Sequence, residues 1–294
     1  MNRKKYAGTW TAIITPFDGF GKVDEAALRK IVQRQIENGV TGVVPCGTTG
    51  ESPTLTWAEQ KRIFEIVVEE AKGKVMVMAG TGSNCTADAV EHTRVAKEAG
   101  VDCCLVVTPY YNKPTPKGLV MHFNAVADVG LPVIVYNIKG RCGINIDTDT
   151  LMEIAKHKMI VGVKEASGDL NQMREVLDRC DDDFTVLCGD DGLTLELIKM
   201  GGDGVISVAS NLVPGQISEM VEYALVGNFE EAGKINEHLM RLFKDIFVEA
   251  NPIPVKYIAS KLGLCEEVYR LPMCEATDKT KQYLDETIGF YNLK

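Results

Sequence analysis

Short apolar runs alternate with helical patterns eight times in the first 226 residues, and this alternation restricts the possible folds most. The runs are rich in branched residues and bounded by turn residues, which is typical of strands buried in a parallel sheet. Strands and helices at this spacing indicate βα units. The runs span residues 11–14, 42–45, 75–79, 103–107, 132–136, 160–164, 185–188 and 204–208.

Helices are expected between these runs, and several of their ends carry sequence signals. Asp24 is placed to cap the first helix, and the segment that starts at Thr56 and reaches Glu59 has the pattern of a capping box. Gly100 is expected just after the end of the third helix. The expected helices span residues 24–37, 56–72, 86–99, 117–129, 147–156, 170–179, 191–200 and 214–226.

Eight βα units predict an α/β fold of the (β/α)8 TIM-barrel type. The competing fold is a doubly wound open sheet, which usually has fewer strands and often carries a glycine-rich nucleotide loop. Residues 80–85 lack the third glycine of the dinucleotide fingerprint, and residues 47–51 lack the ending of a Walker loop. Both absences favour the barrel.

From residue 227 onwards the alternation stops. Helical patterns cover residues 229–248, 255–262 and 277–291. We therefore expect two parts, a barrel over residues 1–226 and a C-terminal helical extension over residues 227–294. The extension would pack on the barrel or build an oligomer interface.

The composition excludes several classes of partner. A formal net charge of −9 argues against binding to nucleic acid or anionic membranes. No apolar run is long enough to span a membrane, and no signal-peptide core follows the basic N-terminus, so a cytoplasmic protein is expected. Nine scattered cysteines fit a reducing compartment. None of the four histidines is paired at a metal-binding spacing, so no metal site is expected.

A lysine ends the sixth strand-like run, where a barrel places its active site. Burial of Lys164 would lower the pKa of its amine and make it a nucleophile that forms Schiff bases with ketones. A single lysine at such a position more often reaches the surface or pairs with a carboxylate. Likewise, Glu51 and the pair Asp190–Asp191 could simply cap helices.

Other residues expected at the same rim favour the catalytic interpretation of Lys164. The backbone amides of residues 47–51 can form a nest for a carboxylate. Tyr111 and Tyr136 can donate protons, and Arg141 can bind a second carboxylate through two hydrogen bonds. Together these residues predict a site for an α-keto acid and a second anionic substrate.

Several segments resemble the signature of the dihydrodipicolinate synthase/N-acetylneuraminate lyase superfamily. The resemblance covers essentially the whole chain and keeps the order of the motifs. Residues 251–256 and 270–273 are similar to the C-terminal part of dihydrodipicolinate synthases in particular. The signature segments are Gly47-Thr48-Thr49-Gly50-Glu51, Tyr110-Tyr111, Tyr136-Asn137, Val163-Lys164-Glu165-Ala166-Ser167-Gly168 and Gly189-Asp190-Asp191.

The resemblance implies a lyase of lysine and diaminopimelate biosynthesis that condenses pyruvate with L-aspartate 4-semialdehyde. It implies that Lys164 forms an imine with pyruvate, that Thr49 and its loop hold the pyruvate carboxylate, and that Arg141 binds the carboxylate of the aldehyde. No metal or organic cofactor is implied. The implied assembly is a homotetramer, a dimer of two tight dimers.

The resemblance also implies a proton relay that two subunits share. Tyr136 and Thr48 would belong to one subunit, and Tyr111 would be supplied by its neighbour. Gly189 and Ile206 would place backbone carbonyl groups near the lysine.

Two residues beside Arg141 depart from the family pattern. Lys139 and Cys142 stand where synthases usually carry proline and threonine, so the segment loses a fixed φ and gains a positive charge. Two alternatives therefore remain open. One is a pyruvate-dependent aldolase of the same superfamily that acts on a sugar acid or another aldehyde. The other is a keto-acid-binding protein on the same fold without catalytic activity.

Overall fold

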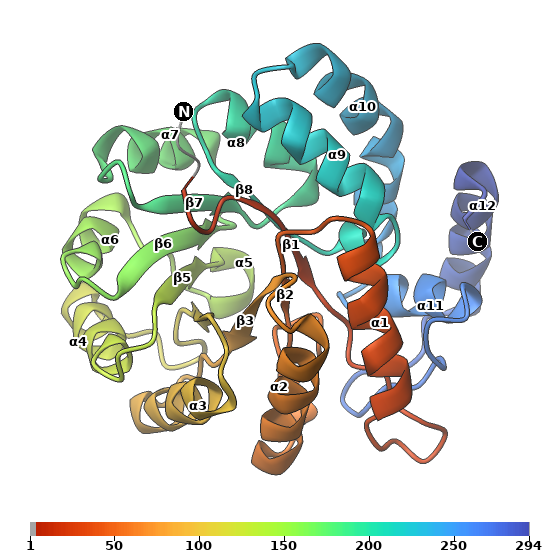
Figure 1. The fold of residues 1–294 in the computed structure, drawn as a ribbon, viewed down its shortest axis with the longest axis horizontal. Coiled ribbons are helices and arrows are strands. Elements are labelled where there is room, and N and C mark those ends of the chain that lie inside the picture. The colour runs from red at the N-terminus through yellow and green to blue at the C-terminus, as the bar shows by residue number, and fades with distance from the viewer. Residues whose placement is uncertain (1–3, 294) are drawn as a thin grey trace.

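The computed structural model describes residues 4–293 and shows a closed barrel of eight parallel strands in sequential order (Figure 1). The barrel closes where β8 pairs with β1, with Trp10 opposite Ile206. The predicted (β/α)8 fold is confirmed. The strands are β1 (Gly8–Ala12), β2 (Gly42–Val44), β3 (Met76–Gly80), β4 (Cys103–Val107), β5 (Val133–Asn137), β6 (Ile160–Glu165), β7 (Thr185–Cys188) and β8 (Gly204–Ser207).

Helices surround the strands in chain order, and short 3-10 turns follow three of the strands. The α-helices are α1 (Glu25–Glu37), α2 (Trp57–Ala71), α3 (Thr86–Ala99), α4 (Pro116–Ala127), α5 (Lys139–Cys142), α6 (Thr148–Ala155), α7 (Leu170–Arg179), α8 (Thr194–Lys199), α9 (Pro214–Leu225), α10 (Phe229–Asp245), α11 (Ile253–Lys261) and α12 (Asp278–Tyr291). The 3-10 turns are η1 (Ser52–Thr54), η2 (Asp191–Leu193) and η3 (Ala209–Asn211).

The capping signals in the sequence are confirmed. The Asp24 side chain accepts a hydrogen bond from the Ala27 amide at the start of α1. Thr56 and Glu59 form the reciprocal hydrogen bonds of a capping box at the start of α2. Gly100 ends α3 in the left-handed region, at φ 87°. These local contacts fix the helix ends that the sequence predicted.

Three segments differ from the sequence prediction. The first strand is Gly8–Ala12, because the Ile14 amide leaves the sheet and donates to the Asn211 side chain (3.1 Å). The helix predicted over 191–200 begins as a 3-10 turn, since the Asp191 carboxylate accepts hydrogen bonds from amides after β8. Residues 139–142, expected as a loop, form the short helix α5.

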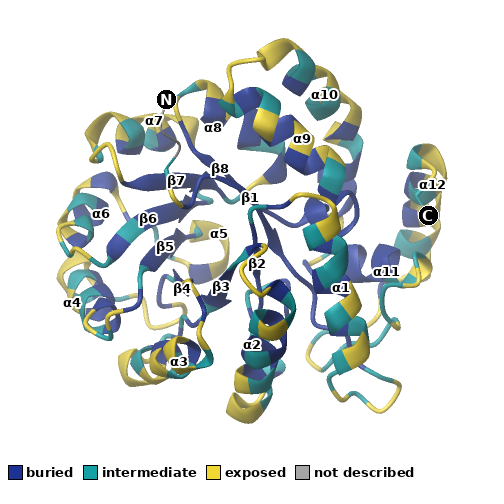
Figure 2. Ribbon diagram, viewed as in Figure 1, coloured by how far each residue is buried: buried dark blue, intermediate teal, exposed yellow. Residues whose placement is uncertain are grey.

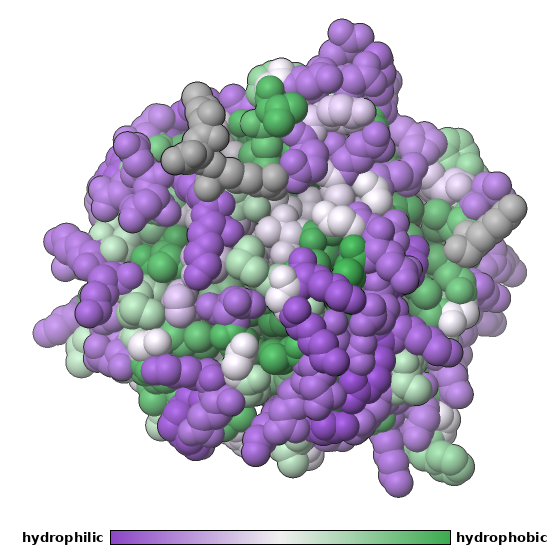
Figure 3. All heavy atoms as spheres, viewed as in Figure 1, coloured by the Kyte–Doolittle hydropathy of each residue, from purple (hydrophilic) through white to green (hydrophobic). Residues whose placement is uncertain are grey.

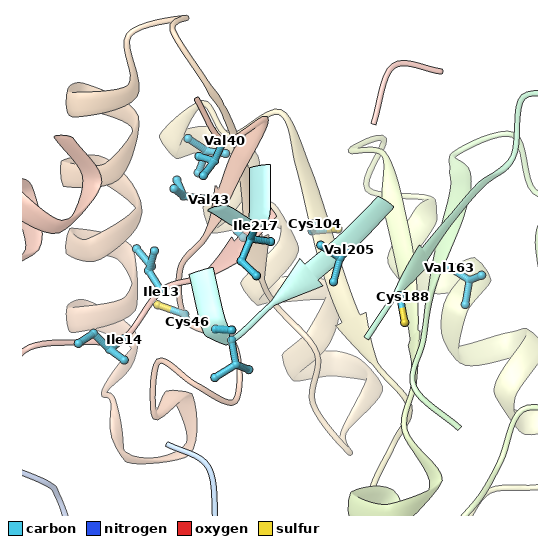
Figure 4. Packing of buried hydrophobic residues seen from close by; sticks show 14 of the residues in the cluster. Ile13, Ile14, Val40, Val43, Cys46, Cys104, Val163, Cys188, Val205 and Ile217 are labelled. Carbon is cyan, nitrogen blue, oxygen red and sulfur yellow. The ribbon is translucent and has the colours of Figure 1, made fainter. Parts of the chain in front are cut away.

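The core consists of two apolar layers, one on each side of the sheet. Val163, Val205 and Ile217 belong to the outer layer, between strands and helices (Figure 4). Side chains on alternate strand positions, such as Leu187, fill the barrel interior. Figure 2 shows buried strands inside helices whose outer faces are exposed. This alternation turns the side chain of Lys164 inward, because its neighbour Val163 points outward.

The C-terminal helices lie outside the barrel, with α10 at the top and α11 and α12 at the right of Figure 1. Helix α10 packs on α8 and α9, and α12 packs on α10 and α11. On the face drawn in Figure 3, hydrophilic side chains predominate and apolar ones lie scattered among them. Within residues 4–293, no helix combines the length and apolar character needed to cross a membrane.

Candidate active site

The Lys164 side chain lies in a cavity at the carboxyl end of the barrel and is 5% exposed. In the register of the sheet it stands opposite Tyr136 of β5, and its Nζ lies 4.2 Å from the centre of the Tyr136 ring. A glycine is required beside it. A Cβ on Gly189 would lie 3.0 Å from Lys164 Cε and 2.5 Å from Ala166 Cβ. Space for the lysine side chain therefore depends on Gly189.

Burial sets the protonation of the Lys164 amine. Its pKa falls from 10.5 to about 8, chiefly through desolvation; the carboxylate of Asp191 opposes this shift, and the positive charge of Arg141 adds to it. A useful fraction of the amine is therefore neutral and nucleophilic near neutral pH.

Tyr136 is buried against the lysine and keeps its proton. Burial raises the pKa of its phenol well above the ordinary value, and a hydrogen bond with Thr48 partly opposes this shift. The phenol is therefore protonated at neutral pH and can donate to an oxygen that develops negative charge. Thr48 and Tyr136 both line the cavity, so the structure brings these two predicted relay residues together.

The loop after β2 carries Thr48 and Thr49 along the wall of the cavity. Two non-glycine residues that flank them, Cys46 and Glu51, have positive φ of 54° and 55°. Such conformations are uncommon for residues with a Cβ and persist where surrounding contacts hold them. The Gly50 and Glu51 amides donate to carbonyls inside the loop, at 3.1 Å each. The loop is thus a tight turn whose shape is fixed by its own backbone.

Helix α5 brings Arg141 to the same cavity. Its side chain is exposed, lines the cavity and donates to the Asn251 carbonyl oxygen (3.3 Å). The two unusual residues of this helix do not displace it: Lys139 is exposed, and the buried Cys142 thiol donates to the Thr108 carbonyl oxygen (3.2 Å). Arg141 therefore places a cation at the cavity, between Lys139 and Cys142.

Two of the predicted site residues do not line the cavity in this single chain within the described residues. Ile206 is buried in the barrel interior and does not line the cavity within the described residues. Tyr111 projects into solvent, 88% exposed with φ 74°, and also lies outside the cavity lining. The cavity of one chain is therefore lined by Lys164, Tyr136, Thr48, Thr49, Arg141 and Gly189, whereas Tyr111 and Ile206 are not part of its lining.

Sequence reasoning missed the part of the site that comes from the C-terminal extension. Phe247 and Asn251 line the cavity. Asn251 donates from Nδ2 to Thr49 Oγ1 (3.0 Å). In the sequence, segment 251–256 stands out only as a family motif, and no spacing rule in a single sequence connects it with the loop after β2.

Two carboxylates considered as helix caps have other roles. Glu51 makes no capping hydrogen bond; it forms a buried ion pair with Lys256 (2.6 Å), and both side chains are at most 1% exposed. Asp190 does cap η2, through the Gly192 amide, but Asp191 is buried and hydrogen-bonded to Ser207. In the part of the chain that the structure describes, no group of three or more His, Cys, Asp or Glu side chains could hold a metal ion.

The comparisons with known proteins agree with this geometry. The model of the dihydrodipicolinate synthetase family matches residues 5–290. The chain belongs to this family. A protein of Endomicrobium trichonymphae named 4-hydroxy-tetrahydrodipicolinate synthase is 48% identical over 290 residues, covering 98% of this chain and 99% of that protein.

Solved structures of family members superpose on nearly the whole chain. Dihydrodipicolinate synthase from Aquifex aeolicus is 43% identical with a TM-score of 0.96, over 98% of this chain and 99% of that one. The chloride-inhibited dihydrodipicolinate synthase from Acinetobacter baumannii, complexed with pyruvate, is 36% identical with a TM-score of 0.96, over 98% and 99% of the two chains.

Proposed function

We propose that this chain is a 4-hydroxy-tetrahydrodipicolinate synthase that condenses pyruvate with L-aspartate 4-semialdehyde. The observation that carries the proposal is the Lys164 amine, which is buried at the cavity with a pKa lowered to about 8 and stands against the protonated phenol of Tyr136. The names of the family relatives support the same product, and a solved relative complexed with pyruvate supports pyruvate as one substrate. The cation of Arg141 at the cavity mouth fits a second carboxylate.

The proposed reaction begins with attack of the Lys164 amine on the ketone carbon of pyruvate. The carbinolamine loses its hydroxyl as water, protonated through Tyr136 and Thr48, and an imine forms. Loss of a methyl proton gives an enamine. Its terminal carbon bonds to the aldehyde carbon, the aldehyde C=O π bond opens, its oxygen takes up a proton, and the imine to Lys164 is restored. The amino group of the aldehyde substrate then attacks the imine carbon, closes the ring and releases Lys164.

We propose the binding roles that the family resemblance implies. Thr49 and its loop hold the pyruvate carboxylate, and Arg141 holds the carboxylate of the aldehyde. Gly189 and Ile206 offer backbone carbonyls near the lysine. The lysine supplies the covalent chemistry, so the proposed reaction needs no metal or organic cofactor.

We also propose that the working enzyme is a cytoplasmic homotetramer, a dimer of dimers. The exposed side chain of Tyr111, with its positive φ, supports a role in the relay of a neighbouring subunit. Residues 1–226 would form the catalytic barrel and residues 227–294 the extension.

The test measures turnover of L-aspartate 4-semialdehyde with pyruvate beside a panel of sugar aldehydes. Turnover of the semialdehyde alone is expected. Borohydride with pyruvate should add one reduced pyruvate to the wild type and none to Lys164→Ala. The surface variant Lys234→Met of α10 is the control and should still be labelled, because Lys234 pairs with Glu230 and Glu231 and does not line the cavity. Consumption of a sugar aldehyde instead would identify an aldolase. Absence of labelling in the wild type would identify a binding protein without catalytic activity.

A further inference from the structure

The segment that links α10 to α11 reaches back to the catalytic loop after β2. Asn251 is 5% exposed, lines the cavity and donates from Nδ2 to Thr49 Oγ1 (3.0 Å). Its backbone carbonyl accepts the hydrogen bond from Arg141 (3.3 Å). One residue of the extension therefore contacts the groups proposed to bind the carboxylates of both substrates.

A second contact holds this segment in place. Lys256 lies one turn into α11 and pairs with Glu51, two residues after Thr49. The Glu51 carboxylate also accepts from the Arg270 amide (3.3 Å). Because the loop and the segment are joined at both positions, the Asn251 side chain is held at a fixed distance from Thr49.

The direction of the Asn251–Thr49 hydrogen bond has a chemical consequence. An amide NH2 can only donate, so the threonine oxygen accepts, and the hydroxyl keeps its own proton for another partner. Thr49 lines the cavity, so that proton is available to an anion bound there.

We propose that Asn251 is a positioning residue for the keto acid: it orients the Thr49 hydroxyl so that its proton points to the pyruvate carboxylate. This inference rests on the proposed function, because it takes pyruvate as the ligand of the Thr49 loop. It assigns separate roles to the two parts of one residue. The side chain serves pyruvate through Thr49, and the backbone carbonyl serves the aldehyde through Arg141.

The test uses Asn251→Ala and the isosteric Asn251→Asp, with Asn236→Ala of α10 as the matched control. Asn236 contacts Met240 and does not line the cavity. Three quantities are measured: the pyruvate concentration for half-maximal borohydride labelling, the aldehyde KM in turnover, and the midpoint of thermal unfolding. Asn251→Ala removes one hydrogen bond, so half-maximal labelling should need roughly fivefold more pyruvate. The aldehyde KM should stay within about twofold, since Arg141 binds a backbone atom that the substitution keeps.

The aspartate variant separates positioning from packing. A carboxylate cannot donate to Thr49; it accepts the hydroxyl proton, turns it away from the cavity and repels the pyruvate carboxylate. Asn251→Asp should therefore weaken pyruvate binding more than Asn251→Ala, by more than roughly tenfold in total. A packing role predicts the opposite order, because the aspartate keeps the shape.

Three results would overturn the inference. One is an unchanged pyruvate requirement in both variants. Another is an aspartate variant milder than the alanine variant, and the third is an equal loss for pyruvate and aldehyde. If wild type itself is not labelled by pyruvate and borohydride, the proposed function fails together with the inference. If wild type is labelled and one of the other results appears, only the role of Asn251 is wrong.

Discussion

The pH at which Lys164 becomes a nucleophile follows from its burial. With a pKa of about 8, roughly one tenth of the amine is neutral at pH 7 and about nine tenths at pH 9. The neutral fraction of an ordinary lysine, whose pKa is 10.5, would instead rise about a hundredfold between these two pH values. The initial rate of imine formation with dilute pyruvate should therefore rise about tenfold from pH 7 to pH 9 and then level off.

The assay traps the imine with cyanoborohydride and follows the mass of the intact protein from pH 6 to pH 10. Lys164→Ala supplies the background from surface lysines. The phenol of Tyr136 does not confuse the profile, because burial raises its pKa beyond this range. A rate that keeps rising tenfold per pH unit beyond pH 9 would refute the argument that desolvation sets this pKa.

A second variant tests the cause of the shift. The Asp191 carboxylate raises the pKa of Lys164, against the effect of burial. Asp191→Asn removes that charge and can still accept hydrogen bonds from the amides after β8. The midpoint of the profile should move below that of wild type. A move to higher pH would show that Asp191 does not act on Lys164 through its charge.

Three further perturbations have defined outcomes. Lys164→Met should stabilise the fold by up to about 3 kcal/mol below pH 8, because the wild type buries an ammonium there. This gain in stability should vanish as the pH rises towards 10.5, and thermal unfolding measured across this pH range checks it. Lys256→Met leaves the Glu51 carboxylate buried without its partner and should lower the free energy of unfolding, measured with denaturant, by roughly 3–5 kcal/mol. The double variant Glu51→Gln/Lys256→Met should recover most of this loss. Tyr136→Phe should lower kcat by roughly 10²-fold or more, and unchanged turnover would remove Tyr136 from the relay.

The elements that the sequence predicted well are those defined by local pattern. Strand–helix alternation predicted the eight strands to within a few residues of their observed bounds. Tyr136 and Lys164, predicted near the carboxyl ends of two neighbouring strands, lie opposite each other in β5 and β6. Helix α5 was missed because four residues are too short to show a helical period. The position of this helix could not be predicted from the sequence, although the sequence does identify Arg141 as a candidate for binding a carboxylate.

Contacts between distant segments were beyond a single sequence. Asn251 and Thr49 are 202 positions apart, and Glu51 and Lys256 are 205 apart. Neither pair lies on one helix or on neighbouring strands, so no periodicity connects them. The extension was therefore expected only to pack or to form an interface, whereas it also supplies part of the cavity wall.

Two lysines are buried within residues 4–293, and their surroundings explain why only one is proposed as the nucleophile. Burial lowers the pKa of both amines. Lys256 lies within 2.6 Å of Glu51 and has no exposed surface, so its charge is neutralised and no ketone can reach it. Lys164 opens on a cavity, and the carboxylate of Asp191 is engaged by Ser207 and by backbone amides. Reactivity therefore depends on access and on the absence of a direct counter-ion, which burial alone does not determine.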